Sequence, residues 1–313
     1  MKIIKVSAPG KIILSGEHAV VYGKPALISS INLRLNFSIW EGTGRINEEI
    51  VSFISNKVKE FLRKENIIFR DRKFNYGISS DIPIGKGLGS SAALSVASAA
   101  AFLEFYTGKK FSKEDINLLA YEIEQYFHGN PSGADNSASS FGGLIFYRKE
   151  TEFLKNISVL PFTLAGTIKN SFCFIDSGEP KESTKEMVSY VRNKYDRNYQ
   201  RIEKILSDME RVTKQLTVSI KINNKKMLKE SIRENEDLLE RLGVVSSFSK
   251  SIIREIEKKG GTAKICGGGG MRKGTGIILA FHEDKTAVDK SVKTFNLKTH
   301  DIKLDTQGFR REN

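Results

Sequence analysis

The segment Asp81–Ala93, DIPIGKGLGSSAA, decides how this 313-residue chain is interpreted. Its glycines, Gly85, Gly87 and Gly89, leave the backbone free to adopt positive φ and to approach a ligand closely. An apolar run follows from Ser90 to Tyr106 and predicts a mostly buried helix. A glycine loop that leads into a helix gathers unpaired N–H groups at the positive end of the helix dipole, which suits a phosphate. The segment therefore predicts a phosphate-binding loop, and a tight turn with a serine cap is the structural alternative.

Two common nucleotide-binding patterns do not fit this loop. A P-loop requires GxxxxGK[ST], but Lys86 lies between the glycines. A dinucleotide-binding fingerprint, GxGxx[GA], fits Gly87–Ala92, but it also requires a second parallel strand that ends in an acidic residue about twenty positions later. At that distance the chain has only Glu104 in a helical stretch and a polar GKKFSKED segment. Both patterns are therefore excluded.

The composition describes an ordinary globular protein. Hydrophobic residues make up 39% of the chain and charged residues 28%, and the length suits two domains or one large one. The longest apolar stretch is too short and too rich in serine to span a bilayer, and no secretory signal is expected before residue 7. Two cysteines, Cys173 and Cys266, are too few for a disulfide framework or a CxxC metal site. We therefore expect a cytoplasmic protein.

The chain is basic, with a formal net charge of +13. Its Lys and Arg residues alternate with acidic residues, as in KKMLKESIRENEDLLER at 225–241, and it has no Arg-rich arm and no aromatic-basic RNA-binding motif. We attribute the charge to solvated helix faces and to attraction of anionic substrates. A basic nucleic-acid-binding protein is the alternative from a different functional class.

Strands and helices are intermixed without a strict βαβ repeat, which predicts an α+β fold. In the first half we expect strands over 2–7, 11–14, 26–40, 73–80 and 142–148, and helices over 48–66, 90–106 and 112–127. In the second half we expect strands over 171–177, 262–266, 276–281 and 297–305, and helices over 183–216, 224–241, 246–259 and 284–294.

Four segments resemble the GHMP small-molecule kinases. The loop Pro83–Ala93 is similar to their PxxxGLGSSAA motif at every fixed position. Residues 7–23, SAPGKIILSGEHAVVYG, resemble the N-terminal motif of the mevalonate kinases within this superfamily, and residues 128–136, HGNPSGADN, resemble their catalytic segment. Residues 264–276, KICGGGGMRKGTG, are similar to the C-terminal glycine motif. The four segments occur in family order and span nearly the whole chain.

The resemblance implies a two-domain GHMP kinase fold with the active site between the domains. An N-terminal ATP-binding α+β domain is expected over 1–165 and a C-terminal ferredoxin-like domain over 166–313. The GEHAVVYG and HGNPSGADN motifs together imply phosphorylation of the primary hydroxyl of mevalonate in isoprenoid biosynthesis. Homoserine kinase, phosphomevalonate kinase and mevalonate 3-kinase are the alternatives within the superfamily. The implied partners are mevalonate and ATP, without nucleic acid or membrane, and a homodimer is left open.

Phosphoryl transfer to an alcohol needs cradled phosphates, Mg²⁺ held by oxygen ligands, and a carboxylate near the hydroxyl. By resemblance, Asp135 of PSGAD is the catalytic base, and Lys11 of APGK supports it and the developing alkoxide. Whether Asp135 removes the proton or only orients the hydroxyl is left open. Ser91 and Glu124 are implied to hold the cofactor Mg²⁺. Glu124 lies eleven residues before Asp135. A turn aspartate and a surface glutamate are the structural alternatives.

The resemblance also implies which residues bind the two substrates. Glu17 and His18 of the GEH triplet are implied to line the mevalonate pocket, and Thr184 of PKEST occupies the place of a family threonine near the substrate. The family arginine before that threonine appears here as Lys181, in a segment one residue longer. The residues implied to bind ATP are Pro83, Gly85, Lys86, Gly87, Leu88, Gly89, Ser90, Ser91 and Ala92.

The C-terminal glycine motif departs from the family pattern. Mevalonate kinases have a KLTGAGGGGC-like run, whereas here Cys266 replaces the threonine and four glycines follow. Met271, Arg272 and Lys273 replace the remainder. The two cations contact phosphate in one interpretation and only solvent in the other, and Cys266 is expected to be a small filler.

The substitution of arginine by Lys181 leads to a prediction about substrate affinity. A lysine offers a point charge to a carboxylate in place of a bidentate fork. Lys181→Ala should raise KM for mevalonate and leave KM for ATP nearly unchanged, because an interaction equal in the ground and transition states mainly changes KM. Lys181→Arg should restore binding in part. An unchanged mevalonate KM in Lys181→Ala would remove this residue from the site.

Overall fold

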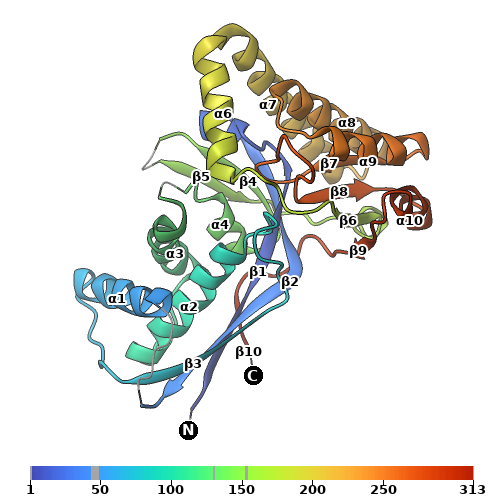
Figure 1. Cartoon of the computed structure of the whole chain (residues 1–313). Helices are drawn as coiled ribbons and strands as arrows, with labels where there is room; N and C mark the ends of the chain where they lie inside the picture. Colours follow the sequence, from blue (N-terminus) through green and yellow to red (C-terminus); the bar gives the residue numbers. More distant parts are fainter. Residues whose placement is uncertain (1, 44–48, 130, 152–153, 313) are drawn as a thin grey trace.

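The structure, a computed structural model, describes residues 2–43, 49–129, 131–151 and 154–312 (Figure 1). Two β-sheets lie side by side, and helices cover each of them, so the predicted α+β class is confirmed. Helices α1 to α4 form the layer over the sheet built mainly from the first half of the chain, and α8, α9 and α10 contact the strands of the second sheet. No helix of the described residues is long and apolar enough to cross a bilayer.

The first sheet contains six antiparallel strands. The order is β10-β1-β2-β4-β5, and β3 pairs with β2 beside this path. The strands are β1 (Ile4–Ser15), β2 (Ala26–Glu41), β3 (Phe74–Ser80), β4 (Leu144–Lys149), β5 (Lys155–Val159) and β10 (Arg310–Glu312). The two strands predicted over 2–7 and 11–14 form the single strand β1, whose register against β2 shifts between Pro9 and Lys11. Such an irregularity bends a strand and redirects a side chain.

Helices α2 (Ser90–Thr107) and α4 (Ala134–Phe141) pack on the first sheet, and α1 (Glu49–Lys64) and α3 (Lys113–His128) pack against α2. The predicted helices at 90–106 and 112–127 are confirmed, and the Ser112 side chain caps α3 by accepting a hydrogen bond from the Asp115 amide. Helix α2 is buried on nearly all sides because α1, α3, β1 and β2 surround it. This environment explains the alanine-rich run that follows the glycine loop.

Helix α4 is not among the helices that the sequence predicts. Gly133 opens the helix with a φ of 89°, and the residues that follow have small side chains. Most of them are buried, including Ala134 and Ser137 to Ser140. Serine and asparagine have weak helix propensity. Packing against β1, α2 and α3 therefore stabilises a helix that local sequence does not predict.

The second sheet has the order β7-β8-β6-β9, with all neighbours antiparallel. Its strands are β6 (Phe172–Asp176), β7 (Thr262–Ile265), β8 (Ile277–Phe281) and β9 (Thr299–Asp301). One strand, a helical region, two strands, α10 (Lys285–Lys293) and a last strand follow one another along the chain. This βαββαβ arrangement confirms the ferredoxin-like topology expected for the second half. The short helices η1 (Ala19–Tyr22) and α5 (Gly166–Lys169) lie in connections.

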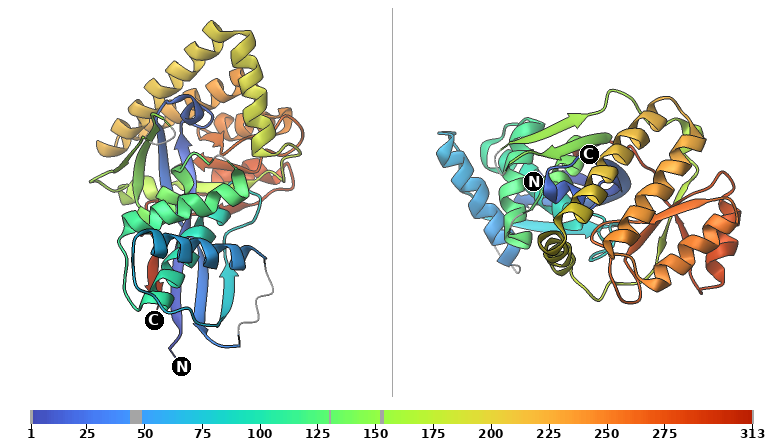
Figure 2. Two further views of the ribbon diagram at one scale, coloured as in Figure 1. Left: turned by 90° about the vertical axis from the view of Figure 1, so that its left-hand side faces the viewer. Right: turned by 90° about the horizontal axis from the view of Figure 1, so that it is seen from above.

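The charged helical region contains four helices: α6 (Thr184–Arg197), α7 (Tyr199–Lys221), α8 (Lys225–Leu242) and α9 (Ser247–Lys258). The single helix predicted over 183–216 is wrong, because Asn198 has a non-helical backbone, with φ −145° and ψ 61°, and separates α6 from α7. Figures 1 and 2 show these two helices meeting at a sharp angle at one end of the molecule. The continuous charge pattern hid this break.

The two halves share a hydrophobic core and a terminal segment. One cluster of buried side chains includes Leu88 and Phe102 from the first half and Leu216 and Phe281 from the second. After β9 the chain returns to the first sheet, where β10 pairs with β1 at an edge that the sequence did not predict. A Cβ atom on Gly142 would lie 2.0 Å from the Gly308 nitrogen, so this return path requires glycine. The division at residue 165 stays a prediction.

Candidate active site

The irregularity in β1 brings two of the sequence motifs into direct contact. The Lys11 amide donates a hydrogen bond to the Leu88 carbonyl at 2.9 Å, so the APGK strand holds the glycine loop. A Cβ atom on Gly10 would lie 2.6 Å from the same carbonyl, and one on Gly89 would lie 2.8 Å from Cγ of Lys11. The close approach therefore depends on glycine on both sides.

The Lys11 ammonium forms an ion pair with Asp135, with 3.0 Å between Nζ and Oδ2. The Lys11 side chain is only 5% exposed, whereas the Asp135 side chain is 35% exposed and faces solvent at its open side. Asp135 lies in the first turn of α4, a helix that the sequence did not predict. The positive end of the helix dipole and the Lys11 charge both stabilise the carboxylate. The structure thus brings the two predicted catalytic residues together; Asn130, in the same motif, lies outside the described residues.

The two predicted metal ligands are also neighbours. Ser91 Oγ donates to Glu124 Oε2 at 3.3 Å, and Ser95 Oγ donates to Glu124 Oε1 at 2.9 Å. Burial raises the pKa of Glu124 to about 7, and the Ser95 hydrogen bond partly opposes this shift. The Asp135 carboxylate raises the pKa further. A cation placed here would offset the cost of a buried negative charge.

A histidine that the sequence analysis did not single out adjoins this pair. His128 Nε2 lies 3.1 Å from Ser91 Oγ and 3.6 Å from Glu124 Oε2. One signal in the sequence could have identified His128: it lies four residues after Glu124 at the end of a predicted helix, and this spacing places both side chains on one face.

The glycine loop has the backbone that the sequence predicts. Gly85, Gly87 and Gly89 have φ values of 74°, 77° and 75°, in the left-handed region. Gly89 occupies the N-cap position of α2 and provides no side-chain cap, so the first turn of the helix is open to an anion. Lys86 forms an ion pair with Asp176 at the end of β6, with 3.3 Å between Nζ and Oδ1.

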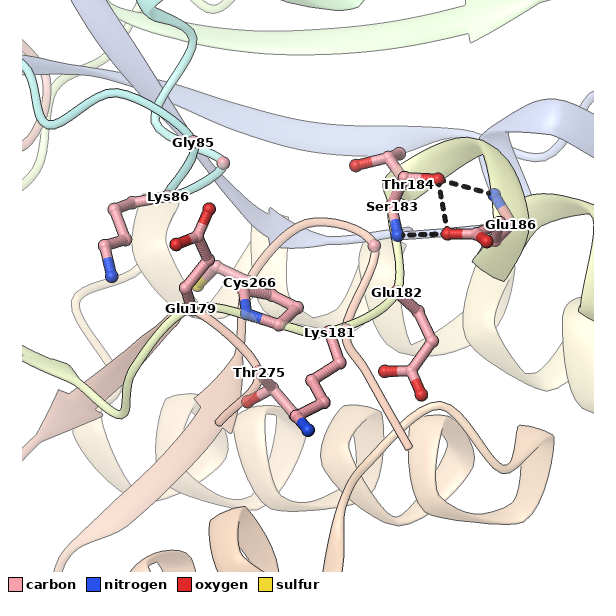
Figure 3. A pocket seen from close by; sticks show the side chains of 15 residues that line it. Gly85, Lys86, Glu179, Lys181, Glu182, Ser183, Thr184, Glu186, Cys266 and Thr275 are labelled. Carbon is pink, nitrogen blue, oxygen red and sulfur yellow. Dashed lines mark hydrogen bonds between the residues drawn. The ribbon is translucent and has the colours of Figure 1, made fainter. Parts of the chain in front are cut away.

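A cavity of about 410 Å³ opens where this loop meets the second half of the chain. Three segments line it: the loop at 85–87, the segment 179–184, and the glycine segment that begins at Cys266 (Figure 3). Lys181 and Thr184 both line this cavity. A Cβ atom on Gly268 would lie 3.2 Å from Thr184, so the glycine segment packs tightly against the start of α6.

The altered end of the glycine segment is fixed by Glu182. Its Oε2 accepts a hydrogen bond from the Met271 amide at 3.2 Å, and its Oε1 lies 3.6 Å from Nε of Arg272. The Arg272 side chain is 75% exposed. Burial raises the pKa of the Cys266 thiol to about 12, which agrees with its expected role as a filler.

Glu17 and His18 of the GEH triplet are both buried. Glu17 is buried and pairs with the fully buried Lys264, which also donates to the Ile265 carbonyl at 2.7 Å. His18 has a φ of 59°, and its Nε2 lies 3.0 Å from the carbonyl oxygen of Gly268, a residue that lines the cavity. Burial lowers the pKa of His18 to about 4, so its ring is neutral at pH 7.

A second buried carboxylate lies beneath the glycine segment. Glu236 of α8 is fully buried, and its Oε2 accepts a hydrogen bond from the Ile265 amide at 2.9 Å. Its other oxygen has no hydrogen-bond partner among the described residues. Burial raises the pKa of Glu236 to about 8, although the Ile265 hydrogen bond and the Lys264 charge oppose the shift. The GEH turn, β7 and α8 are therefore joined by one buried polar network.

Comparisons with known proteins agree with this geometry. The family model of the GHMP kinases N terminal domain matches residues 52–143. A mevalonate kinase from Archaeoglobus fulgidus is 34% identical over 276 residues, which cover 84% of this chain and 88% of that protein. The crystal structure of the Methanococcus jannaschii mevalonate kinase superimposes with a TM-score of 0.77 at 23% identity, covering 97% of this chain and 99% of the other. The Streptococcus pneumoniae phosphomevalonate kinase gives 0.80 at 15% identity, covering 97% and 100%. The structural similarities confirm the expected fold.

The buried Glu236 leads to a prediction about stability and pH. Since its pKa is raised in the folded chain, the folded state keeps a proton that the unfolded state releases between the ordinary glutamate pKa and about pH 8. The free energy of unfolding should therefore fall as the pH rises through this range. Glu236→Gln keeps an acceptor for the Ile265 amide and should reduce that fall. Urea unfolding of both proteins across the range measures it.

The matched control is Glu230→Gln, which changes an exposed glutamate of the same helix and should leave the pH dependence as it is in the unmodified chain. Equal pH dependence in Glu236→Gln and the unmodified chain would contradict the prediction.

Proposed function

The chain belongs to the mevalonate kinase family of the GHMP kinases, and from this premise we propose how its residues carry out ATP-dependent phosphorylation of mevalonate. The enzyme transfers the terminal phosphoryl group of ATP to the primary hydroxyl of mevalonate. One observation supports the assignment of residues most directly: the ion pair between Lys11 and Asp135 lies beside the glycine loop and the buried Glu124. A carboxylate, a cation and a phosphate-binding loop are the groups that this transfer requires.

In this proposal Asp135 contacts the hydroxyl of mevalonate. Its partly exposed carboxylate accepts the hydroxyl hydrogen bond and takes the proton as the bond to phosphorus forms. The buried Lys11 ammonium holds Asp135 in place and stabilises negative charge on the attacking oxygen. The open N-terminus of α2 and the loop from Pro83 to Ala92 hold the phosphates of ATP. Lys86 is close enough to the cavity to exchange its Asp176 partner for a phosphate oxygen.

The pair of Ser91 and Glu124 fits Mg²⁺, which we propose as the cofactor. A hydroxyl and a carboxylate are hard oxygen ligands, and Mg²⁺ usually keeps phosphate and water ligands beside one or two from the protein. Burial raises the pKa of Glu124 to about 7, so a bound cation would stabilise its carboxylate. When bound, Mg²⁺ would neutralise charge on the phosphates.

We place mevalonate in the cavity between the glycine loop and the segment 179–184. There Lys181 supplies a charge for the substrate carboxylate and Thr184 a hydroxyl. The neutral ring of His18 would act by hydrogen bonding and not by charge. Glu17 is buried, so we propose that it positions His18 through its pairing with Lys264.

We further propose two domains divided near residue 165, a cytoplasmic location, and activity without nucleic acid or membrane, with a homodimer left open. Another GHMP kinase activity is the main alternative, because a phosphomevalonate kinase shares the fold equally well. A coupled ADP-release assay with mevalonate, phosphomevalonate and homoserine separates these substrates. Salt-sensitive RNA binding without ATP turnover would favour the nucleic-acid alternative.

Asp135→Ala should keep the fold and the affinity for ATP but lower kcat by at least ~10²-fold, because a positioned acid-base group contributes that much or more. Steady-state kinetics measure the change in kcat, and binding of a non-hydrolysable ATP analogue measures the affinity for the nucleotide. The matched control is Asp301→Ala, which breaks a surface ion pair with Lys285 and should leave kcat unchanged. Turnover within a few-fold of the unmodified enzyme in well-folded Asp135→Ala protein would refute the assignment.

Glu124→Gln and Ser91→Ala should each raise the Mg²⁺ concentration needed for half-maximal rate, because each removes a charge or an oxygen ligand from a hard-cation site. A magnesium titration at saturating substrates measures this shift. Glu122→Gln, on the same helix but two residues earlier, serves as the control and should not change the titration. If both site variants titrate like the unmodified enzyme, the metal is bound elsewhere.

A further inference from the structure

Three side-chain atoms from two helices form a small triangle at the edge of the glycine loop. They are Oγ of Ser91 on α2 and Oε2 of Glu124 and Nε2 of His128 on α3. The sides of the triangle measure 3.1 Å from serine to histidine, 3.3 Å from serine to glutamate, and 3.6 Å from histidine to glutamate. Because Glu124 and His128 are four residues apart on one helix, their side chains point to the same face.

The size of this triangle matches one face of a metal coordination octahedron. Metal–ligand bonds of about 2.1 Å place adjacent ligands of an octahedron about 3.0 Å apart. The sides of 3.1, 3.3 and 3.6 Å exceed that value, the histidine–glutamate side most, so a small rotation of the exposed His128 side chain would bring all three atoms onto one cation. Three positions on the opposite face then stay open for phosphate oxygens and water.

The surroundings of the triangle orient the carboxylate toward it. Ser95 holds the other oxygen, Oε1, of Glu124 by a buried hydrogen bond of 2.9 Å, so Oε2 faces Ser91 and His128. Partners that orient a ligand in this way are a regular feature of metal sites. The His128 side chain is 52% exposed while that of Glu124 is 2% exposed, so the triangle opens to solvent on the histidine side. A metal–nucleotide complex can enter from there.

We propose that His128 is a third metal ligand and that it sets the metal preference of this kinase. The proposal rests on the metal site of Ser91 and Glu124 proposed above. Imidazole nitrogen is a ligand for first-row transition-metal ions, of which Mn²⁺ is bound least strongly, whereas Mg²⁺ favours oxygen ligands. A site of one nitrogen and two oxygens therefore binds Mn²⁺ more tightly, relative to Mg²⁺, than the same site with oxygen ligands alone.

The direct test is pulsed electron paramagnetic resonance of Mn²⁺ bound to the full-length protein with ADP. The spin echo of Mn²⁺ is modulated by a directly coordinated imidazole nitrogen. We expect this modulation in the unmodified protein and its loss in His128→Asn. His282→Asn is the matched control, because His282 lies on the surface with its Nε2 3.0 Å from the Lys259 carbonyl, and the signal should persist. Bound Mn²⁺ without nitrogen modulation, or modulation that survives in His128→Asn, overturns the proposal.

The second measurement is the affinity for each metal, from titration of the protein–ADP complex with Mn²⁺ and with Mg²⁺. His128→Asn should weaken Mn²⁺ binding by about 10-fold or more and change Mg²⁺ binding much less. An unchanged ratio of the two affinities overturns the proposal, and thermal unfolding confirms that the variant is folded.

Failure of this inference can be told apart from failure of the proposed function. If Ser91→Ala and Glu124→Gln weaken both metals while His128→Asn leaves the ratio unchanged, the metal site is correct and only the histidine ligand is wrong. If all three variants bind both metals as the unmodified protein does, the proposed metal site itself is wrong.

Discussion

The backbone hydrogen bond between Lys11 and Leu88 is the contact on which the rest of the site depends. It fixes the glycine loop against the irregular strand β1 and passes the Lys11 side chain under Gly89 toward Asp135. Side chains at positions 10 and 89 would collide with this path, so the glycines are required by packing as well as by the expected phosphate. Because the loop leads into α2, the same contact also fixes where the open helix N-terminus and Ser91 lie relative to Lys11.

The second half of the chain is held to this centre by charges that are buried. The Glu17–Lys264 pair joins the GEH turn to β7, and Glu236 of α8 binds the next residue of that strand through the Ile265 amide. Losing one partner of a buried ion pair costs about 3–5 kcal/mol, because the remaining charge is left without compensation. Because the network is costly to break, it holds His18 and the glycine segment around Gly268 in fixed positions relative to each other. The cavity proposed to receive mevalonate is thus shaped by residues that do not line it.

Local sequence was sufficient to predict the features that depend only on neighbouring residues. The alanine-rich run after the loop, the Ser112 cap and the positive φ of the loop glycines were all predicted and confirmed. Helix α4 was missed, because tertiary packing stabilises a stretch of weak helix formers, and the break at Asn198 was hidden in a uniform charge pattern. Strand β10 and the pairing of Glu17 with Lys264 join residues far apart in the chain, and no local pattern reports such contacts. The family motifs brought together Lys11, Asp135, Ser91 and Glu124, but no role was assigned to His128, although it is the first residue of the HGNPSGADN segment.

The most direct test of the central claim, that Asp135 and Lys11 receive the hydroxyl of mevalonate beside the glycine loop, is a crystal structure with mevalonate and a non-hydrolysable ATP analogue. The account predicts the primary hydroxyl oxygen within hydrogen-bond reach of Asp135, about 2.6–3.2 Å, with the terminal phosphate held by the loop and in line with that oxygen. A hydroxyl bound away from Asp135 and Lys11, with the phosphate nevertheless in line for attack, would contradict it.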